Sequence, residues 1–321
     1  MNVTHSEAWK LLNENDDILI LTHRAPDGDA VGSLCALYRM LLKLGKRVGF
    51  VLDAVSRELQ FLTEGLVSEE FEPKCVVTVD VGDKKLLGDA LERQYGDRVL
   101  LSIDHHATNV LFAENTLLDD RAAAASEVLY DMFTENGAEI TEDIAMPLYV
   151  GLATDTGCFK YGNTTSKTMR AAAALMDTGI NTAAVNTDIF DTKTKEYFAL
   201  ETMAMNSIKM YFDGKCALLM LTKDMYRRAN IAENETQGIN ALPRQIAGVL
   251  VGITIKERES GNYRISVRTR EPVDASEICS LLGGGGHRQA AGCELTANPR
   301  TVISTILKYT EETLKEQGFI E

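Results

Sequence analysis

The sequence predicts an α/β protein with two domains: a larger one built on a parallel β-sheet with helices on both faces, and a smaller α/β domain after it. Two observations carry this prediction. Short apolar runs alternate with helical patterns through the first half of the chain, which is typical of a parallel sheet with crossover helices. The chain also has 321 residues, more than one domain usually contains, so two hydrophobic cores are expected.

Four apolar runs in the first half are expected to form strands, over residues 18–23, 47–53, 75–80 and 98–104. Helical patterns cover residues 28–44, 121–133, 142–153 and 166–179. Three of the strands end in His23, Asp80 and Asp104. Because the carboxyl ends of strands in an open α/β sheet line the ligand crevice, we expect these three side chains to converge.

The two domains are expected to meet at a charged, helix-compatible segment without Pro or Gly, from about Asn186 to Lys209. This predicts a first domain over residues 1–186, a connecting helix over 187–209 and a second domain over 210–321. Within the second domain, strands are expected over 215–222, 247–257 and 262–270, helix-like residues over 275–282 and a closing helix over 299–318.

The charge balance argues against long nucleic acid as a partner. Lys and Arg number 33 against 47 Asp and Glu, a formal net charge of -14, and a field of this sign repels an extended polyphosphate. A small anion can still be bound where local groups override the global charge. The six cysteines lack the CxxC pairs of a zinc site, and no stretch approaches the roughly 18 apolar residues of a membrane span. We therefore expect a cytoplasmic protein with no membrane partner.

The loop after the first expected strand gathers candidate metal ligands. His23, Asp27 and Asp29 place one imidazole and two carboxylates within seven residues, and Pro26 and Gly28 mark a turn between them. Carboxylates combined with imidazole suit Mn²⁺. Taken alone, the segment could also be a solvated turn in which an aspartate caps the next helix.

Further acidic and histidine residues follow apolar runs at Asp80, at the triplet 104–106 and at Asp155. Each single aspartate could be an ordinary turn residue. The adjacent His105 and His106 should point in different directions, so one can bind a metal while its neighbour faces a substrate. Asp104 is near enough in sequence to orient an imidazole. The joint pattern favours a shared metal centre over separate turns.

A glycine run in the second domain predicts an anion-binding loop. The backbone N–H groups of Gly284, Gly285 and Gly286 can close around a phosphate, and His287 and Arg288 can add charge-assisted hydrogen bonds. A helix beginning near Arg288 would direct its N-terminus toward the same anion. A flexible loop is the competing interpretation.

Two arginines on the expected strand 262–270 are further candidates for phosphate binding. Arg268 and Arg270 alternate along the strand and therefore share one face. Solvated charges on an edge strand are the competing interpretation, with about equal weight.

Taken together, these segments resemble the DHH phosphoesterase superfamily. HRAPDGDAVGS, VTVD, SIDHH and TDTGCF are similar to its four successive motifs, and GGGGHRQAAG is similar to its DHH-associated C-terminal domain. Motif order and spacing cover almost the whole chain. Among members, the chain most resembles the short, stand-alone bifunctional oligoribonucleases and 3′-phosphoadenosine-5′-phosphate (pAp) phosphatases. Many relatives carry Arg or another polar residue where this chain has Cys158 and Lys160, which puts substrate contacts there in doubt.

The resemblance implies a centre of two Mn²⁺ ions, for which Mg²⁺ or Co²⁺ could substitute. Asp80 would bridge the ions. The remaining ligands would be His23, Asp27 and Asp155 for one ion, and Asp29, His105 and Asp155 for the other. Asp104 and His106 match the rest of the triplet and would be catalytic, with His106 facing the substrate. Nucleotide binding would involve Arg268, Gly284, Gly285, Gly286, His287 and Arg288.

The implied function is hydrolysis of short oligoribonucleotides to 5′-mononucleotides and of pAp to AMP and phosphate. Both reactions release the nucleotide 3′-oxygen, which His106 could protonate, and a nucleoside could be held across an interdomain cleft. The nearest alternative is a phosphodiesterase for linear or cyclic dinucleotides. A RecJ-like exonuclease on long single strands, a family II pyrophosphatase and a non-catalytic nucleotide-binding regulator fit less well. A homodimer is possible.

Overall fold

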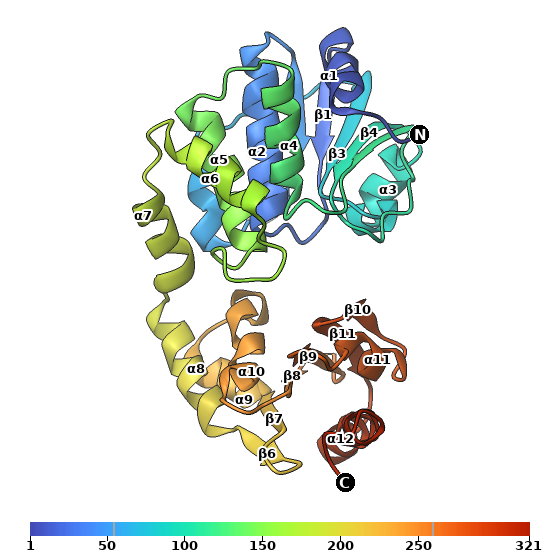
Figure 1. Cartoon of the computed structure of the whole chain (residues 1–321), viewed down its shortest axis with the longest axis vertical. Coiled ribbons are helices and arrows are strands. Elements are labelled where there is room, and N and C mark those ends of the chain that lie inside the picture. The colour runs from blue at the N-terminus through green and yellow to red at the C-terminus, as the bar shows by residue number, and fades with distance from the viewer. Residues whose placement is uncertain (54, 259) are drawn as a thin grey trace. The chain divides into compact units, whose positions relative to one another are not determined.

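The N-terminal part of the chain is built on a five-stranded sheet in the order β2-β1-β3-β4-β5, in which every neighbouring pair is parallel (Figure 1). The structure is a computed structural model that describes residues 1–53, 55–258 and 260–321. It divides into two compact units, Met1–Thr192 and Lys193–Glu321. The strands of the first unit are β1 (Ile18–Leu21), β2 (Val48–Val51), β3 (Cys75–Val79), β4 (Val99–Asp104) and β5 (Asn115–Leu118).

The predicted fold class is confirmed, because helices cover both faces of this parallel sheet and a second sheet follows in the C-terminal unit. The helices of the first unit are α1 (His5–Glu14), α2 (Gly28–Lys43), α3 (Asp89–Tyr95), α4 (Ala125–Glu135), α5 (Glu142–Asp155), α6 (Ser166–Met176) and α7 (Thr182–Asn186). Short 3₁₀ helices η1 (Arg57–Leu62) and η2 (Lys84–Leu87) and the π-helical turn η3 (Thr187–Asp191) complete it.

The strand order reverses at β1, since β2 lies on one side of it and β3 on the other. In open α/β sheets ligands bind outside the carboxyl ends of the strands at such a switch point. The segments that follow β1 and β3 contain His23 and Asp80, so the topology places both at the edge where a ligand is expected.

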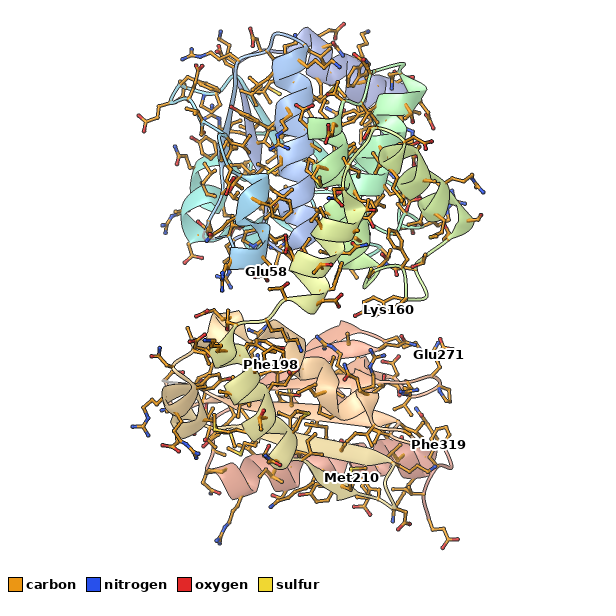
Figure 2. The ribbon with its side chains drawn as sticks, turned by 90° about the vertical axis from the view of Figure 1, so that its left-hand side faces the viewer. Glu58, Lys160, Phe198, Met210, Glu271 and Phe319 are labelled. Atoms are coloured by element: carbon orange, nitrogen blue, oxygen red, sulfur yellow. The ribbon has the colours of Figure 1, made fainter. Side chains whose placement is uncertain are left out.

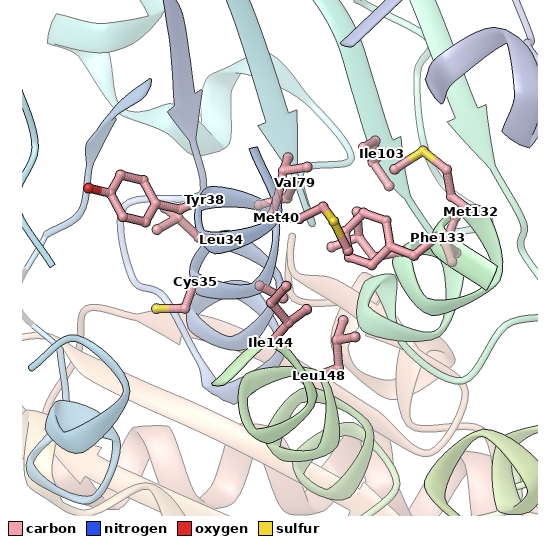
Figure 3. Packing of buried hydrophobic residues seen from close by; sticks show 14 of the residues in the cluster. Leu34, Cys35, Tyr38, Met40, Val79, Ile103, Met132, Phe133, Ile144 and Leu148 are labelled. Carbon is pink, nitrogen blue, oxygen red and sulfur yellow. The ribbon is translucent and has the colours of Figure 1, made fainter. Parts of the chain in front are cut away.

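The main core lies between the sheet and the helices α2, α4 and α5. Figure 3 shows side chains from all of these elements meeting there, including Met40 of α2, Val79 of β3, Phe133 of α4 and Leu148 of α5. Helix α2 is buried over most of its length, as its nearly continuous apolar sequence requires. A smaller cluster on the opposite face of the sheet packs β1 and β3 against η2 and α3.

The C-terminal unit contains a six-stranded mixed sheet in the order β10-β11-β9-β8-β7-β6, in which only β7 and β8 are parallel. Its strands are β6 (Lys209–Tyr211), β7 (Cys216–Leu221), β8 (Val251–Glu257), β9 (Tyr263–Thr269), β10 (Gly285–His287) and β11 (Ala290–Leu295). Its helices are α8 (Lys195–Asn206), α9 (Lys223–Ala229), α10 (Leu242–Gln245), α11 (Ala275–Ser280) and α12 (Pro299–Glu316), with short turns η4 (Glu233–Glu235) and η5 (Gln237–Ala241).

Two expectations about helices are wrong. No single helix runs from Asn186 to Lys209: the π-helical turn η3 ends at Asp191, and α8 begins at Lys195 with Thr194 as its cap. No helix begins near Arg288 either, because the next element is strand β11. The small residues Ala290, Ala291 and Gly292 are compatible with a helix or a strand. They form a strand because they pair with β9.

Among the described residues, no helix combines the length and the apolar character that crossing a membrane requires. The side chains drawn in Figure 2 show charged groups distributed over the outside of each unit.

Helices α2 and α5 approach each other closely through glycines. A Cβ on Gly32 would clash with the carbonyl oxygen of Pro147 and would lie 3.1 Å from the backbone nitrogen of Gly151. Backbone atoms cannot move aside as the end of a side chain can. We therefore predict that Gly32→Ala lowers the free energy of unfolding by about 1–3 kcal/mol in urea denaturation. Gly162→Ala is the matched control, because a Cβ there meets nothing within 4 Å. Equal stability of the two variants would contradict this account of the helix contact.

Candidate functional site

The residues after β1 and β3 lie side by side at the carboxyl edge of the sheet. His23 Nε2 is 3.6 Å from Asp80 Oδ2 and 4.0 Å from Asp27 Oδ1. His23 and Asp80 are mostly buried, whereas the side chain of Asp27 is half-exposed. The imidazole and the two carboxylates thus form a small cluster that solvent reaches from the side of Asp27.

Asp27 also caps helix α2. Its Oδ1 accepts hydrogen bonds from the backbone N–H groups of Asp29 and Ala30, each at 3.1 Å. Asp27 therefore does both: it caps the helix, and it belongs to the cluster with His23 and Asp80. The cap fixes the carboxylate rigidly, since it belongs to the first turn of the most buried helix of the unit.

Asp29 is fully buried and is held by the N-terminus of another helix. Its Oδ2 accepts from the N–H of Ala125 at 2.6 Å, and its Oδ1 accepts from the N–H of Ser126 at 3.0 Å and the hydroxyl of Ser33 at 3.1 Å. These donors belong to the start of α4 and to α2. A helix N-terminus stabilises a negative charge, and these three hydrogen bonds also fix the orientation of the Asp29 carboxylate.

Asp80 occupies the middle of the site. It is 3% exposed, and its backbone has φ +58°, a left-handed conformation that is uncommon for a residue with a side chain. Its Oδ1 is buried and has no hydrogen-bond partner among the described residues. This oxygen lies 3.6 Å from both His105 Nε2 and His106 Nδ1. Buried carboxylate oxygens normally accept a hydrogen bond. An oxygen that lacks a donor, as this one does, can be satisfied by a metal ion instead.

The two histidines of the triplet have different partners. His105 Nδ1 is 3.3 Å from the carbonyl oxygen of Ala122, which can only accept a hydrogen bond. The proton of His105 therefore sits on Nδ1, and the lone pair on Nε2 faces Asp155 Oδ2 at 3.3 Å and Asp29 Oδ2 at 3.8 Å. This orientation is the one that a metal-binding imidazole needs.

His106 instead donates to a buried carboxylate. Its Nδ1 is 2.8 Å from Asp104 Oδ1, and Asp104 Oδ2 accepts from the side-chain amide of Asn109 at 2.6 Å. Burial would raise the pKa of Asp104, but the hydrogen bonds from His106 and Asn109 outweigh it and hold the pKa below its usual value. The bond to Asp104 raises the pKa of His106 to about 9 despite the opposing effect of burial. The hydrogen bond to Asp104 therefore favours the protonated form of His106.

Three groups of side chains have ligand atoms close enough together to hold a metal ion. They are His23, Asp27 and Asp80; Asp29, His105 and Asp155; and Asp80, His105 and His106. Asp80 and His105 each belong to two groups, so the groups are contiguous. Oxygen and imidazole donors without thiolate suit Mn²⁺ or Mg²⁺ better than structural zinc.

The electrostatics of the cluster also fit bound cations. Burial, followed by the neighbouring carboxylates of Asp29 and Asp27, raises the pKa of Asp80 well above its usual value. Burial and the same neighbours raise the pKa of Asp155. Without positive charge, these carboxyl groups would take up protons instead of remaining ionised together. Cations between them would remove that penalty, which is the behaviour expected of a metal centre.

Comparison with known proteins identifies the family. Residues 17–152 match the DHH family N-terminal domain, and residues 217–316 match the DHHA1 domain. The chain is 34% identical over 94% of its length to the bifunctional oligoribonuclease and PAP phosphatase NrnA of Thermus thermophilus, of which it covers 92%. This chain belongs to the DHH family. It is also 24% identical over 90% of its length to the protein of the same name from Bacillus subtilis, covering 93% of it.

The fold of this DHH protein is also found among solved structures. An exopolyphosphatase-related protein from Bacteroides fragilis superimposes with a TM-score of 0.87 at 22% identity, with 96% of each chain covered. The likeness extends over both sheets.

The DHHA1 region contains the remaining candidate residues. The glycine run forms a hairpin, with β10 paired to β11, and the backbone positions of His287, Ala290 and Arg268 follow one another in one row across β10, β11 and β9. The side chain of His287 lies outside the described residues. Arg288, in the turn, is exposed and 3.8 Å from Asp274 Oδ2. Arg270 lies just beyond β9 and donates to the carbonyl oxygen of Arg244 at 3.1 Å.

The glycines of this hairpin differ in their surroundings. A Cβ on Gly284 would clash with the carbonyl oxygen of Gly292, and a Cβ on Gly286 would lie 2.6 Å from Ala290 O. Gly285 faces open space instead. Close packing of the hairpin therefore accounts for Gly284 and Gly286, whereas Gly285 leaves a backbone surface that a ligand can approach.

Sequence reasoning missed several side chains that support the DHH site. Asn109 holds Asp104, Ser33 holds Asp29, and the amide of Asn163 donates to the carbonyl oxygens of Ala123 at 3.2 Å and Asp155 at 3.1 Å. Asn109 follows the triplet by three residues in a polar loop, and Ser33 lies four residues after Asp29 in the same helix, so both had a local sequence signal. Asn163 lies eight residues after Asp155, and only its contact with Ala123 joins segments that are distant in the sequence.

Asp104 controls the charge of His106, and an isosteric change should reveal it. We predict that Asp104→Asn lowers the pKa of His106 from about 9, because the raising hydrogen bond is lost and burial, which lowers it, remains. NMR titration of the metal-free protein measures this. By linkage, the stability gained from protonating His106 is present below pH about 6.5 and is lost as the pH rises through about 9, whereas the stability gained from ionised Asp104 is lost as the pH falls through its lowered pKa. An unchanged His106 pKa would contradict the assignment.

Proposed function

We propose that this chain is a two-metal phosphoesterase that hydrolyses short oligoribonucleotides to 5′-mononucleotides and pAp to AMP and phosphate. The observation that carries the proposal is the contiguous set of ligand groups joined through Asp80 and His105, next to a His106 imidazole that is hydrogen-bonded to Asp104. The name of the relative from Thermus thermophilus supports the substrate class, since the alignment covers nearly the full length of both chains.

Two cations fit the ligand groups, and Mn²⁺ is the ion that the mixed imidazole and carboxylate donors favour. We assign one to His23, Asp27 and Asp80, and the other to Asp29, His105, Asp80 and Asp155. Asp155 belongs to the second group, with Asp29 and His105, so we assign it to that ion alone. When bound, such a pair of cations activates water and neutralises charge on the phosphoryl group.

The protein's own residues supply orientation and a proton. The N-terminus of α4 fixes Asp29, and the carbonyl of Ala122 fixes the ring of His105. His106 is held by Asp104, which favours its protonated form, so it can donate a proton to the departing nucleotide 3′-oxygen. Cleavage of an internal 3′,5′ linkage and removal of a 3′-phosphate both release this oxygen, and one site can therefore serve both reactions.

We further propose that the first unit is catalytic and that the C-terminal unit binds the nucleotide through Arg268, the backbone of Gly285, His287 and Arg288. We assign the catalytic role to residues 1–186, the connection to residues 187–209 and nucleotide binding to residues 210–321.

The net charge of -14 favours small substrates, because each added phosphate needs a cationic partner. The six cysteines are free, which suits a reducing cytoplasm, where we place the protein.

Asp80 is the sharpest test of the metal assignment. Asp80→Asn preserves shape but removes the charge shared between the two ligand groups, so we expect bound Mn²⁺ to fall and turnover of pAp to drop by at least about 100-fold. Metal analysis and steady-state kinetics measure the two effects. Asp97→Asn is the control, since that aspartate is exposed and forms an ion pair with Lys84 on the surface. Normal Mn²⁺-dependent turnover in the Asp80 variant would refute the role of Asp80.

Substrate length tests the proposed activity. We expect kcat/KM to be highest for pAp and for RNA of two to a few nucleotides, and to fall steeply for a single strand of about 20 nucleotides at physiological salt. Comparable values for the dinucleotide and the long strand would refute the proposal and favour a RecJ-like exonuclease. A preference for cyclic dinucleotides over both would favour the dinucleotide phosphodiesterase instead.

A further inference from the structure

The turn that follows Asp155 has an unusual backbone. Gly157, Cys158 and Phe159 have φ values of +56°, +58° and +61°, so three consecutive residues are left-handed and two of them have side chains. Left-handed backbone is uncommon for residues other than glycine, and for a bulky residue such as Phe159 it is a genuine outlier. Such strained residues persist only when the surrounding structure enforces them, and they concentrate at active sites and ligand clamps.

Hydrogen bonds at both ends enforce this conformation. The N–H of Cys158 donates to the carbonyl oxygen of Ala153 at 2.6 Å, and the N–H of Phe159 donates to the hydroxyl of Thr156 at 3.0 Å. At the far end, Asn163 returns to donate to the carbonyl oxygen of Asp155 at 3.1 Å. The loop therefore closes on the residue that carries one of the carboxylates of the cluster.

The side chains of the closed loop differ in their exposure. Phe159 packs against Tyr149, with ring centroids 5.9 Å apart, and is partly buried. Lys160 and Tyr161 are exposed instead, and Figure 2 shows Lys160 at the outer edge of the N-terminal unit. Tyr161 keeps 52% of its surface exposed although it is a large aromatic residue.

The ring of Tyr161 packs on the turn itself. It lies against the Cα of Gly157, where an added Cβ would be 2.6 Å from Tyr161 Cε1, so glycine is needed both for the positive φ and for this contact. The ring thus lies beside a residue only two positions from Asp155, with half of its surface open. An exposed aromatic ring in this position is suited to stack on a flat, aromatic ligand.

We propose that Tyr161 stacks on a nucleobase adjoining the scissile phosphodiester and so helps to bind the nucleotide substrate. This inference rests on the proposed function. The turn after Asp155 places the ring against Gly157, two residues from a carboxylate of the cluster. Tyr161 is therefore a substrate-specificity residue that contacts the base and takes no part in proton transfer or metal binding.

The experiment compares Tyr161→Leu and Tyr161→Phe on an RNA dinucleotide and on its two abasic analogues, each lacking one base. We expect Tyr161→Leu to lower kcat/KM for the intact dinucleotide by roughly 5- to 100-fold, mainly through KM, because one base–aromatic stack is lost. Tyr161→Phe should stay within about twofold of the wild type. For the analogue that lacks the stacked base, Tyr161→Leu should have no effect.

The alternative is that Tyr161 only supports the turn. Tyr161→Leu would then displace Asp155 and lower kcat equally on the dinucleotide and both abasic analogues, and that result would overturn the inference. Unchanged kinetics of Tyr161→Leu on the intact dinucleotide would overturn it as well. If the wild type does not hydrolyse the dinucleotide, the proposed function is wrong, and the inference about Tyr161 falls with it. If the wild type is active and the variants behave as in either of the two preceding results, only the inference about Tyr161 is wrong.

Discussion

Electrostatic repulsion among carboxylates is the constraint on which the rest of this site depends. The fold gathers Asp27, Asp29, Asp80, Asp104 and Asp155 at one edge of a sheet, where water cannot screen them fully. Three of the five have local hydrogen-bond partners: backbone N–H groups bind Asp27 and Asp29, and His106 with Asn109 bind Asp104. Asp80 and Asp155 have none of comparable strength, and their raised pKa values show the cost. Divalent cations would balance the negative charges of Asp80 and Asp155.

The same constraint separates the roles of two adjacent histidines. His105 and His106 are neighbours with ring centroids 4.5 Å apart, yet the partner of each Nδ1 differs. A backbone carbonyl accepts from Nδ1 of His105 and leaves its Nε2 facing carboxylates, whereas the carboxylate of Asp104 favours the protonated form of His106. One side chain is thereby suited to hold metal and the other to donate a proton.

Close helix packing brings the acidic residues together. Asp29 belongs to α2 and Asp155 ends α5, and glycines at the crossing of these helices allow their backbones to approach. A Cβ on Gly151 would collide with both Ser126 and Asp29, so even a methyl group there would disturb a ligand. Backbone strain is found in the same region, at Asp80 and at the turn after Asp155, as is common where function fixes geometry. Stability and function are thus determined by the same contacts.

The sequence by itself determined the fold class, the main strands of the first unit and the set of residues that meet at its edge, because apolar runs and strand-terminal polar residues are local patterns. It did not determine that Asp27 both caps α2 and joins the cluster, that α4 begins only at Ala125 and so offers free N–H groups to Asp29, or that the residues after Arg288 form a strand. Nor could it show that Asn163 reaches Ala123. The contact of Ala125 with Asp29, the contact of Asn163 with Ala123 and the pairing of β11 with β9 join partners that are distant in the sequence, and only the packed chain brings them within hydrogen-bonding distance.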